Sequence, residues 1–331
     1  MHKRRDRRAF LGASALVLYS AYAPAQTAPF PQRMISMVVP YPPGNPTDAV
    51  ARQLAPLMGK DLGQTLIVDN VAGAGGALGV QKALSAPADG HMMLMSTTTE
   101  LILSPLGVAA AKYTPRELRL AGYIGRTPYA LMGRPDLPAA NLPDLLAQMR
   151  KPGTTELSYG STGPGSLIHL AGARFGQVSG LKLLHVPYKG LSPMIQDLMG
   201  NQIDLAFLPL AGSVPSMIEQ GKLRFYGVTA SAPHPLLPRL ATMASLDKAF
   251  QGFDFDVWAA LALPRSVPEP VVSRIHAAFY AALRNPELRQ WLESTGAAIA
   301  APMSLLELDR FYAEQINVYQ ALAKAIGVQP Q

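Results

Sequence analysis

The sequence predicts an α/β protein built from two similar halves, each a parallel sheet with helices on its faces. Short apolar runs are followed by loops rich in Gly, Ser and Pro, and then by longer segments with apolar residues at helical spacing. This order of strand, loop and helix repeats in two stretches of the chain, and such repetition favours parallel strands. Ligands of such folds bind at the carboxyl ends of the strands, so two halves predict a site between two lobes.

The expected strands and helices follow from this pattern of apolar residues. Strands are expected at residues 35–40, 66–69 and 92–95 in the first half and at 157–160, 183–186, 203–207 and 223–228 in the second. Helices are expected through residues 51–58, 78–84, 170–175, 193–199, 269–284 and 304–325. Thr47 or Asp48 is the expected N-cap of the first helix, because short polar side chains accept hydrogen bonds from its free N–H groups.

The composition excludes several classes of protein. The chain has 331 residues, of which 49% are hydrophobic and 15% charged, and this is too apolar for a disordered, collagenous or coiled-coil protein. It contains no cysteine, so disulfides, thiol nucleophiles, zinc ribbons and iron–sulfur ligation are all excluded. At about 150 residues per domain, the length predicts one large domain or two medium ones.

The first 25 residues have the pattern of an export signal. A basic segment at 2–8 precedes an apolar run at 9–18, which is too short to span a bilayer. Ala23-Pro24-Ala25 then matches a signal-peptidase cleavage pattern, so we expect the signal peptide 1–25 to be removed. Arg7-Arg8 also resembles a twin-arginine signal, and Sec and twin-arginine export both remain open.

The net charge does not indicate a nucleic-acid partner. The expected signal holds five basic residues and one acidic residue, so the formal charge of +7 falls to +3 in the mature chain. No stripe of basic and aromatic residues follows, and no later run reaches the roughly 18 apolar residues that a membrane span needs. Because the chain also lacks a lipobox cysteine, we expect a mature protein that is free in the periplasm and monomeric by default.

Four loops that follow strands and precede helices are rich in Gly, Ser and Thr. Backbone N–H groups at helix N-termini bind anions through a partial positive charge of about half a unit. Gly and hydroxyl residues also form ordinary turns and caps, but four such loops divided between two halves favour a shared anion site. Because Lys and Arg are scarce in these loops, a small carboxylate is a better ligand than a polyphosphate.

Motifs for catalysis and cofactors are weak or missing. The loop 160–166 has no Lys before Ser or Thr, so it is not a P-loop, and residues 73–79 only loosely match a dinucleotide fingerprint. The six histidines are scattered without metal-ligand spacing, and no Gly-x-Ser-x-Gly motif occurs. We therefore expect no metal and no cofactor. His169 lies in the first turn of a predicted helix, where it either faces the cleft or packs within its lobe.

Several motifs together resemble a known family across essentially the whole mature chain. They read VPYPPGNPTD at 39–48, VDN at 68–70, GAGG at 73–76, PADG at 87–90, YGSTGPGS at 159–166, HLAG at 169–172, HVPYKG at 185–190 and QID at 202–204. Each piece is unspecific alone, but the combined pattern resembles the Bug, or TctC-like, family of periplasmic solute receptors for tripartite tricarboxylate transporters.

The resemblance implies a type II periplasmic binding fold, with two Rossmann-like lobes joined by two crossover strands. The first lobe would comprise residues 26–126 and 257–331, and the second lobe residues 127–256. Ligand carboxylates would lie between the lobes, held by backbone amides, hydroxyls and water. The first-lobe contacts would be Tyr41, Pro43, Asn45, Thr47, Asp48, Ala74, Gly75, Thr97 and Thr98, and the second-lobe contacts Ser161, Thr162, Gly163, Ser166 and His169, with Asp204 beneath.

The chain departs from the family pattern at a contact loop. Asn45 stands where the family usually has a second Gly, so its side chain is expected to intrude on the ligand or to hydrogen-bond to it. Val71-Ala72 replaces the usual Arg-Pro, Met92-Met93 replaces more polar residues, and Ala173 takes a place that Glu often holds. These changes leave the expected fold intact, but they leave the identity of the ligand open.

The expected function is capture of a small carboxylate, or a related small polar metabolite, for uptake or sensing. A membrane permease or a sensor protein would be the partner of the loaded receptor. The main alternative is an exported enzyme that uses the same cleft, with His169 as a base oriented by Asp204 or Asp48. A third reading is an interaction protein with a vestigial cleft. The residues alone leave these three open, and the resemblance favours the receptor.

Overall fold

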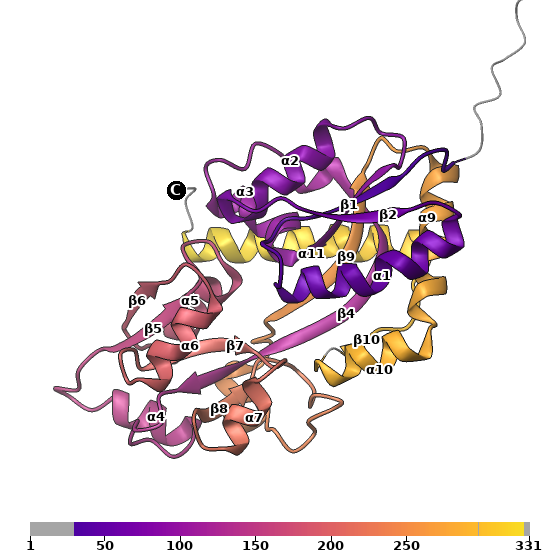
Figure 1. Ribbon diagram of the computed structural model, residues 1–331. Helices are drawn as coiled ribbons and strands as arrows, with labels where there is room; N and C mark the ends of the chain where they lie inside the picture. The colour runs from indigo at the N-terminus through magenta and orange to yellow at the C-terminus, as the bar shows by residue number, and fades with distance from the viewer. Residues whose placement is uncertain (1–29, 297, 328–331) are drawn as a thin grey trace, which may run out of the picture.

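The computed structural model describes residues 30–296 and 298–327 (Figure 1). The strands are β1 Ile35–Val39, β2 Leu66–Asn70, β3 Met92–Thr97, β4 Leu118–Gly133, β5 Leu157–Ser161, β6 Leu183–Pro187, β7 Leu205–Pro209, β8 Arg224–Val228, β9 Asp256–Pro264 and β10 Ala298–Ile299. The helices are α1 Pro46–Leu62, α2 Ala77–Ser85, α3 Ser104–Gly107, α4 Leu142–Met149, α5 Leu167–Ser179, α6 Leu191–Met199, α7 Val214–Glu219, α8 Met243–Leu246, α9 Glu269–Leu283, α10 Pro286–Ser294 and α11 Leu305–Ile326. The expected signal peptide lies outside the described residues.

Two sheets share the long strand β4, which runs from one half of the molecule into the other (Figure 1). The strand order is β2-β1-β3-β9-β4-β7-β5-β6, and β8 and β10 also pair with β4. In the first half β1, β2 and β3 are parallel, and in the second half β5, β6 and β7 are parallel. The partner of β4 changes from β9 to β7 between Pro128 and Tyr129, so the crossover between the halves lies there.

The directions of the strands make the two sets of carboxyl ends face each other. β9 is antiparallel to β3 and to β4, so β1 and β3 run in the same direction as β4, toward the second half. β7 is antiparallel to β4, so β5 and β7 run the opposite way, toward the first half. The loops that follow both sets of parallel strands therefore meet above the crossover, as the sequence predicts for a site between lobes.

Helices cover both faces of the first sheet. Met37 and Val39 belong to a buried cluster with the inner residues of α1 and α9, whereas Val38 belongs to a second cluster with those of α2 and α11. This alternation along β1 is what a strand with two covered faces requires. α11 also reaches the second half, where Gln177 of α5 donates a hydrogen bond to the Ala325 carbonyl (Figure 1). No described helix is long and apolar enough to cross a membrane.

The expected strands and helices correspond to elements of the structure, with differences at their ends, but several elements were not expected from the residue pattern, among them β4, β9, α4 and α10. The N-cap of α1 is Asn45, not Thr47 or Asp48, because the helix begins at Pro46 and the Asn45 side chain accepts a hydrogen bond from the Thr47 N–H. The residue pattern did not predict β4, because its glycines and Pro128 obscure that pattern, and a crossover at 126/127 was expected from the resemblance alone. The pairing of β4 with β9 shifts register near Gly122 and Gly125. The lobe boundaries at residues 126/127 and 256/257 stay a prediction.

The close approach of β4 to α9 yields a test of this packing. A Cβ on Gly122 would lie 2.2 Å from Cδ1 of Phe279, a ring that is fully buried. We expect Gly122→Ala to lower the free energy of unfolding by about 1–3 kcal/mol, because the ring has no free space into which to move. Chemical denaturation measures this loss. The double variant with Phe279→Leu should lose less than the sum of the two single variants, and additive losses would contradict the account.

Candidate functional site

The loops at the facing strand ends are in direct contact across the two halves. Gly107, which ends α3, lies against Gly165 in the loop between β5 and α5. A Cβ on Gly107 would lie 2.7 Å from the Gly165 Cα, so only glycine allows this approach. The N-termini of α1 and α5 belong to opposite halves and follow β1 and β5, the strands whose ends face each other. The halves are therefore close together where the sequence predicts the ligand.

The loop between β1 and α1 is held by the buried carboxylate of Asp48, which is 3% exposed. This carboxylate accepts hydrogen bonds from the Gly44 N–H at 2.9 Å, from Nε of Arg52 at 3.0 Å and from Nδ2 of Asn70 at 2.9 Å. Asn70 also donates to the Tyr41 carbonyl, which ties the end of β2 to the same loop. The hydrogen bonds of the Asp48 carboxylate therefore hold the conformation of the loop. The Asn45 side chain likewise bends back to cap α1.

The loop between β2 and α2 has an unusual backbone. Gly73, Gly75 and Gly76 have positive φ, and so does Ala74, at 48°. A non-glycine residue in this region is uncommon and carries strain. The Gly75 carbonyl accepts a hydrogen bond from Oγ of Ser104, which fixes the loop against the start of α3. Ala74 and Gly75 are therefore placed at the strand ends, as expected.

Glu100 is a buried carboxylate that the sequence analysis did not single out. It follows β3 and is 1% exposed. One oxygen accepts from the Tyr41 hydroxyl, and the other accepts from Ser96 Oγ, Thr97 N and Thr97 Oγ1. We call Glu100 with Tyr41, Ser96 and Thr97 the Glu100 cluster. The sequence does contain a feature that could have identified it, because Glu100 is the sole charged residue between His91 and Lys112.

The other ligand contacts expected in the first half differ in their burial and in their hydrogen bonds. Thr98 is fully buried, and its Oγ1 accepts a hydrogen bond from the Trp258 N–H of β9, so it joins the loop after β3 to the crossover. Thr97 belongs to the Glu100 cluster. Pro43 is exposed in the loop before α1, and Thr47 is 7% exposed at the start of that helix.

The loop between β5 and α5 is organised by hydroxyls and two imidazoles. Ser166 caps α5 by accepting from the His169 N–H. The buried Ser161 hydroxyl accepts from the Gly163 N–H and lies 2.6 Å from Nε2 of His185. Nδ1 of His169 accepts from the Gly165 N–H, and the two imidazole rings stack with centroids 4.4 Å apart. Thr162 is half-buried in the same loop. His169 was expected at this loop from the sequence, whereas His185 was not among the expected contacts.

Burial lowers the pKa of both imidazoles. The pKa of His185 falls to about 4 because of burial and because a charge on neighbouring His169 would repel its own. Burial also holds the pKa of His169 below its usual value. Both rings are therefore neutral near pH 7, and the hydrogen bond from the Gly165 N–H requires an unprotonated Nδ1 on His169.

Asp204 is a correction to the expected site. It precedes β7 and lies beside Ser158 at the amino end of the parallel strands, away from the facing loops. Its carboxylate accepts from the N–H and the hydroxyl of Ser158 and pairs with Nε of Arg134 at 2.9 Å. Because the parallel strands separate Asp204 from His169, it does not orient that imidazole. Asp48 belongs to the other half, and its carboxylate already accepts hydrogen bonds from Gly44, Arg52 and Asn70. Neither carboxylate that the enzyme alternative proposed therefore orients His169.

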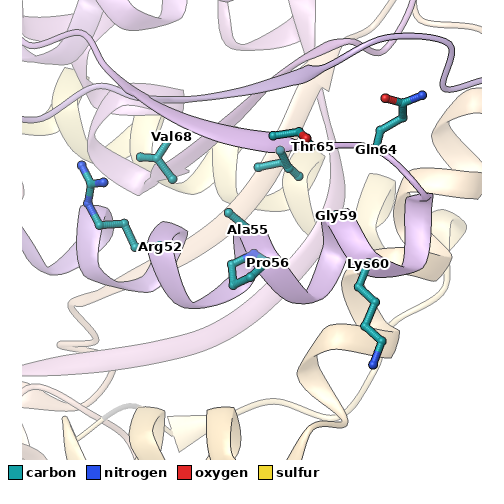
Figure 2. Close-up of a pocket in the computed structure, with 9 residues that line it drawn as sticks. Arg52, Ala55, Pro56, Gly59, Lys60, Gln64, Thr65 and Val68 are labelled. Carbon is teal, nitrogen blue, oxygen red and sulfur yellow. The ribbon is translucent and has the colours of Figure 1, made fainter.

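Two surface grooves lie elsewhere and lack the features of the facing loops. The larger, of about 670 Å³, runs along α1 beside the edge strand β2. Figure 2 shows Ala55 and Pro56 on its helix wall, with Arg52 and Lys60 at its two ends. The smaller, of about 330 Å³, lies beside α9 and is lined by His276 and Tyr280 among others. Neither is at the carboxyl ends of the parallel strands. The described residues contain no cluster of metal-ligating side chains.

Replacing Asp48 tests whether its carboxylate holds the loop. Burial opposes its ionisation, but hydrogen bonds from Arg52, Gly44 and Asn70 outweigh this and hold the pKa of Asp48 below its usual value. The carboxylate therefore stabilises the fold at neutral pH, and the effect is lost as the pH falls through that lowered pKa. We expect Asp48→Asn to cost about 1–3 kcal/mol at pH 7 and less below about pH 4. Denaturation across pH measures this, and exposed Asp144→Asn is the control. A loss independent of pH would contradict the account.

The neutral state of His185 is directly measurable. Its pKa is about 4, against 6.5 for an unperturbed imidazole. The unfolded chain therefore binds more protons between these values, and stability falls as the pH is lowered through this window and levels off below it. We expect the imidazole signals of His185 in NMR spectra, assigned with a His185→Asn variant, to titrate with a midpoint near 4. A midpoint close to 6.5 would contradict the buried arrangement.

The chain is similar to known proteins over most of its length. It is 33% identical over 307 residues to the UPF0065 protein in the tcbD-tcbE intergenic region of Pseudomonas sp. (strain P51), covering 91% of this chain and 90% of that protein. The structure of the periplasmic binding protein BugD has a TM-score of 0.77 at 30% identity, covering 91% of this chain and 100% of that one. R. palustris Rpa4515 with adipate has a TM-score of 0.78 at 28% identity, covering 92% and 100%.

These similarities agree with the fold and the facing loops. The likeness to BugD confirms the two-lobed, type II periplasmic binding fold that the sequence predicts. Residues 50–328 match the tripartite tricarboxylate transporter family receptor, TctC. This is a family of solute receptors and not of enzymes, so the receptor interpretation is confirmed at the level of the family. The chain belongs to the TctC, or Bug, family of periplasmic solute-binding receptors.

Proposed function

We propose that this receptor captures a small carboxylate between its two halves and then presents it for uptake or sensing. The observation that carries the proposal is the contact between opposing loops at Gly107 and Gly165, where the N-terminus of α5 faces the first half. The N-terminus of α1 belongs to the loops of that first half. Helix N-termini favour anions, and a ligand between two of them gains contacts from both halves.

The donors for such a ligand are backbone amides and hydroxyls. In the first half they come from the loops that hold Pro43, Asn45, Thr47, Ala74 and Gly75, and in the second from those that hold Ser161, Thr162, Gly163, Ser166 and His169. Hydrogen bonds to a carboxylate are charge-assisted and contribute roughly 1.5–3 kcal/mol each. A few of them support micromolar affinity, about −8 kcal/mol. The adipate in Rpa4515 supports a carboxylate as ligand.

Ligand contacts on both halves also favour a closed arrangement. The halves are joined by β4 and β9, and a change in the backbone near Pro128 would rotate one half against the other. A ligand that touches both sides binds the closed state more tightly and shifts the population toward it. We place the lobe boundaries at 126/127 and 256/257, with residues 1–25 removed on export to the periplasm. The closed monomer would then meet a membrane permease or a sensor protein.

A thermal-shift screen of residues 26–331 against small carboxylates, amino acids and neutral analogues tests this function. A ligand at 100 times its dissociation constant should add about 2.7 kcal/mol to the free energy of unfolding and raise the Tm by several degrees. Shifts confined to carboxylates are the expected result. A folded protein, free of co-purified ligand, that responds to no carboxylate in a broad panel would contradict the proposal.

The variant Ser161→Ala tests whether the ligand contacts the loop between β5 and α5. The Ser161 hydroxyl links the Gly163 N–H to His185, so its loss disorganises the donors that face the ligand. We expect binding of a carboxylate from the screen to weaken by about 1–3 kcal/mol in titration calorimetry. Ser294→Ala, on α10, is the matched control and should bind as the natural protein does. Unchanged affinity in Ser161→Ala would remove this loop from the site.

A further inference from the structure

The Glu100 cluster lies at the carboxyl ends of the first-half strands. Tyr41 follows β1, and Ser96 and Thr97 end β3. Gly76, in the loop before α2, packs directly on the Glu100 side chain, since a Cβ there would lie 2.3 Å from its Cγ. The carboxylate thus lies beneath three of the loops that form the first-half wall of the site. It is buried by them and fixed in position.

The Glu100 cluster has the hydrogen-bond donors of a carboxylate-binding site, and the side chain of Glu100 itself occupies these donors. Ser96 Oγ, Thr97 N and Thr97 Oγ1 lie 2.9 to 3.1 Å from one oxygen of Glu100, and the Tyr41 hydroxyl donates to the other. The Tyr41 hydroxyl is also 3.2 Å from Thr97 Oγ1, so the two hydroxyls lie side by side with both protons directed at Glu100. The donors of Tyr41 and Thr97, which the sequence analysis assigned to the ligand, are therefore occupied within the first half.

No described Lys, Arg or His forms an ion pair with Glu100. Burial raises the pKa of the Glu100 carboxyl, whereas the hydrogen bonds that Tyr41 and Thr97 donate to it stabilise its ionised form. The charge of that form adds to a larger effect of burial in raising the pKa of Tyr41 and Tyr113. Tyr129 lies on β4 at the crossover, and burial raises its pKa together with the charges of Asp256 and, to a smaller extent, Glu100. A second negative charge in this space would be repelled and would find its hydroxyl donors occupied.

We propose that Glu100 is a specificity-determining residue that restricts the ligand to monocarboxylates, with the ligand carboxylate between the loops before α1 and α5 and an uncharged or cationic end toward Glu100. This inference deepens the proposed function and rests on it.

The first experiment compares ligands of equal length on the natural protein. For chains of four, five and six carbons, titration calorimetry would compare the simple monocarboxylate, the ω-amino acid and the dicarboxylate. We expect the better of the first two to bind at least about tenfold more tightly than the dicarboxylate, because the negative charge of Glu100 would repel the second carboxylate. A dicarboxylate that binds as tightly as its matched monocarboxylates would overturn the inference.

The variant Glu100→Gln removes the charge while keeping the shape. The Gln carbonyl oxygen can accept from Ser96 and Thr97, and its amide can donate to the Tyr41 hydroxyl, so Ser96, Thr97 and Tyr41 each keep a partner. We expect the preference for the monocarboxylate over the dicarboxylate to shrink to about threefold or less. Glu293→Gln, an exposed change of the same kind on α10, should keep the full preference.

The outcomes separate the inference from the function on which it rests. A preference for monocarboxylates that Glu100→Gln reduces and Glu293→Gln preserves supports both. Carboxylate binding with no difference between ligand classes, or with a preference that Glu100→Gln leaves intact, overturns the inference and leaves the proposed function standing. Binding of no carboxylate by the folded natural protein overturns the function, and the inference with it. The comparison on the natural protein needs no variant to fold.

Discussion

The pairing of β4 with β9 on one side and with β7 on the other is the constraint on which the site depends. Because β4 is antiparallel to both partners, the parallel strands of the two halves must run toward each other. Their carboxyl ends, and the helix N-termini that follow, then converge over the crossover at Pro128 and Tyr129. A reversal of either sheet would place the loops on opposite sides of the molecule, whatever their composition.

The loops that converge there are held by buried carboxylates in the first half and by a half-buried imidazole in the second. Asp48 ties the loop before α1 to Asn70 and Arg52, and Glu100 ties Tyr41 to the end of β3. In the second half, His185 supports Ser161. Such groups fix the backbone donors before a ligand arrives, which reduces the entropy lost on binding. They also make each loop sensitive to the protonation state of one residue, a buried carboxylate in the first half and the half-buried imidazole of His185 in the second.

Local sequence patterns predicted most of the fold, and contacts between distant segments account for what was missed. The strands at 66–70 and 92–97 are apolar runs with turn residues on both sides, so their own composition identifies them. β4 has no such signature, because its stability comes from β9, far along the chain.

The parts of the site that depend on one segment of the chain could be predicted from the sequence, and the parts that depend on contacts between distant segments could not. Ser161, Gly163 and Ser166 lie in a loop whose composition already indicates a helix N-terminus. Asp204 shows the limit of such reasoning: it borders a strand, but at the amino end, and strand direction relative to the other half is a property of the sheet. Glu100 accepts hydrogen bonds from Ser96 and Thr97, which are near it in the sequence, and from Tyr41, which lies in another loop. The sequence can indicate the contacts with Ser96 and Thr97, but not the contact with Tyr41.

The central claim is that one carboxylate is held by both halves at once, and a crystal structure of the protein with a carboxylate from the binding screen tests it most directly. The account predicts a ligand carboxylate between the loop that precedes α1 and the loop that precedes α5, with hydrogen bonds from both. A ligand that contacts one half alone, or that occupies the groove beside α1 and β2, would contradict it.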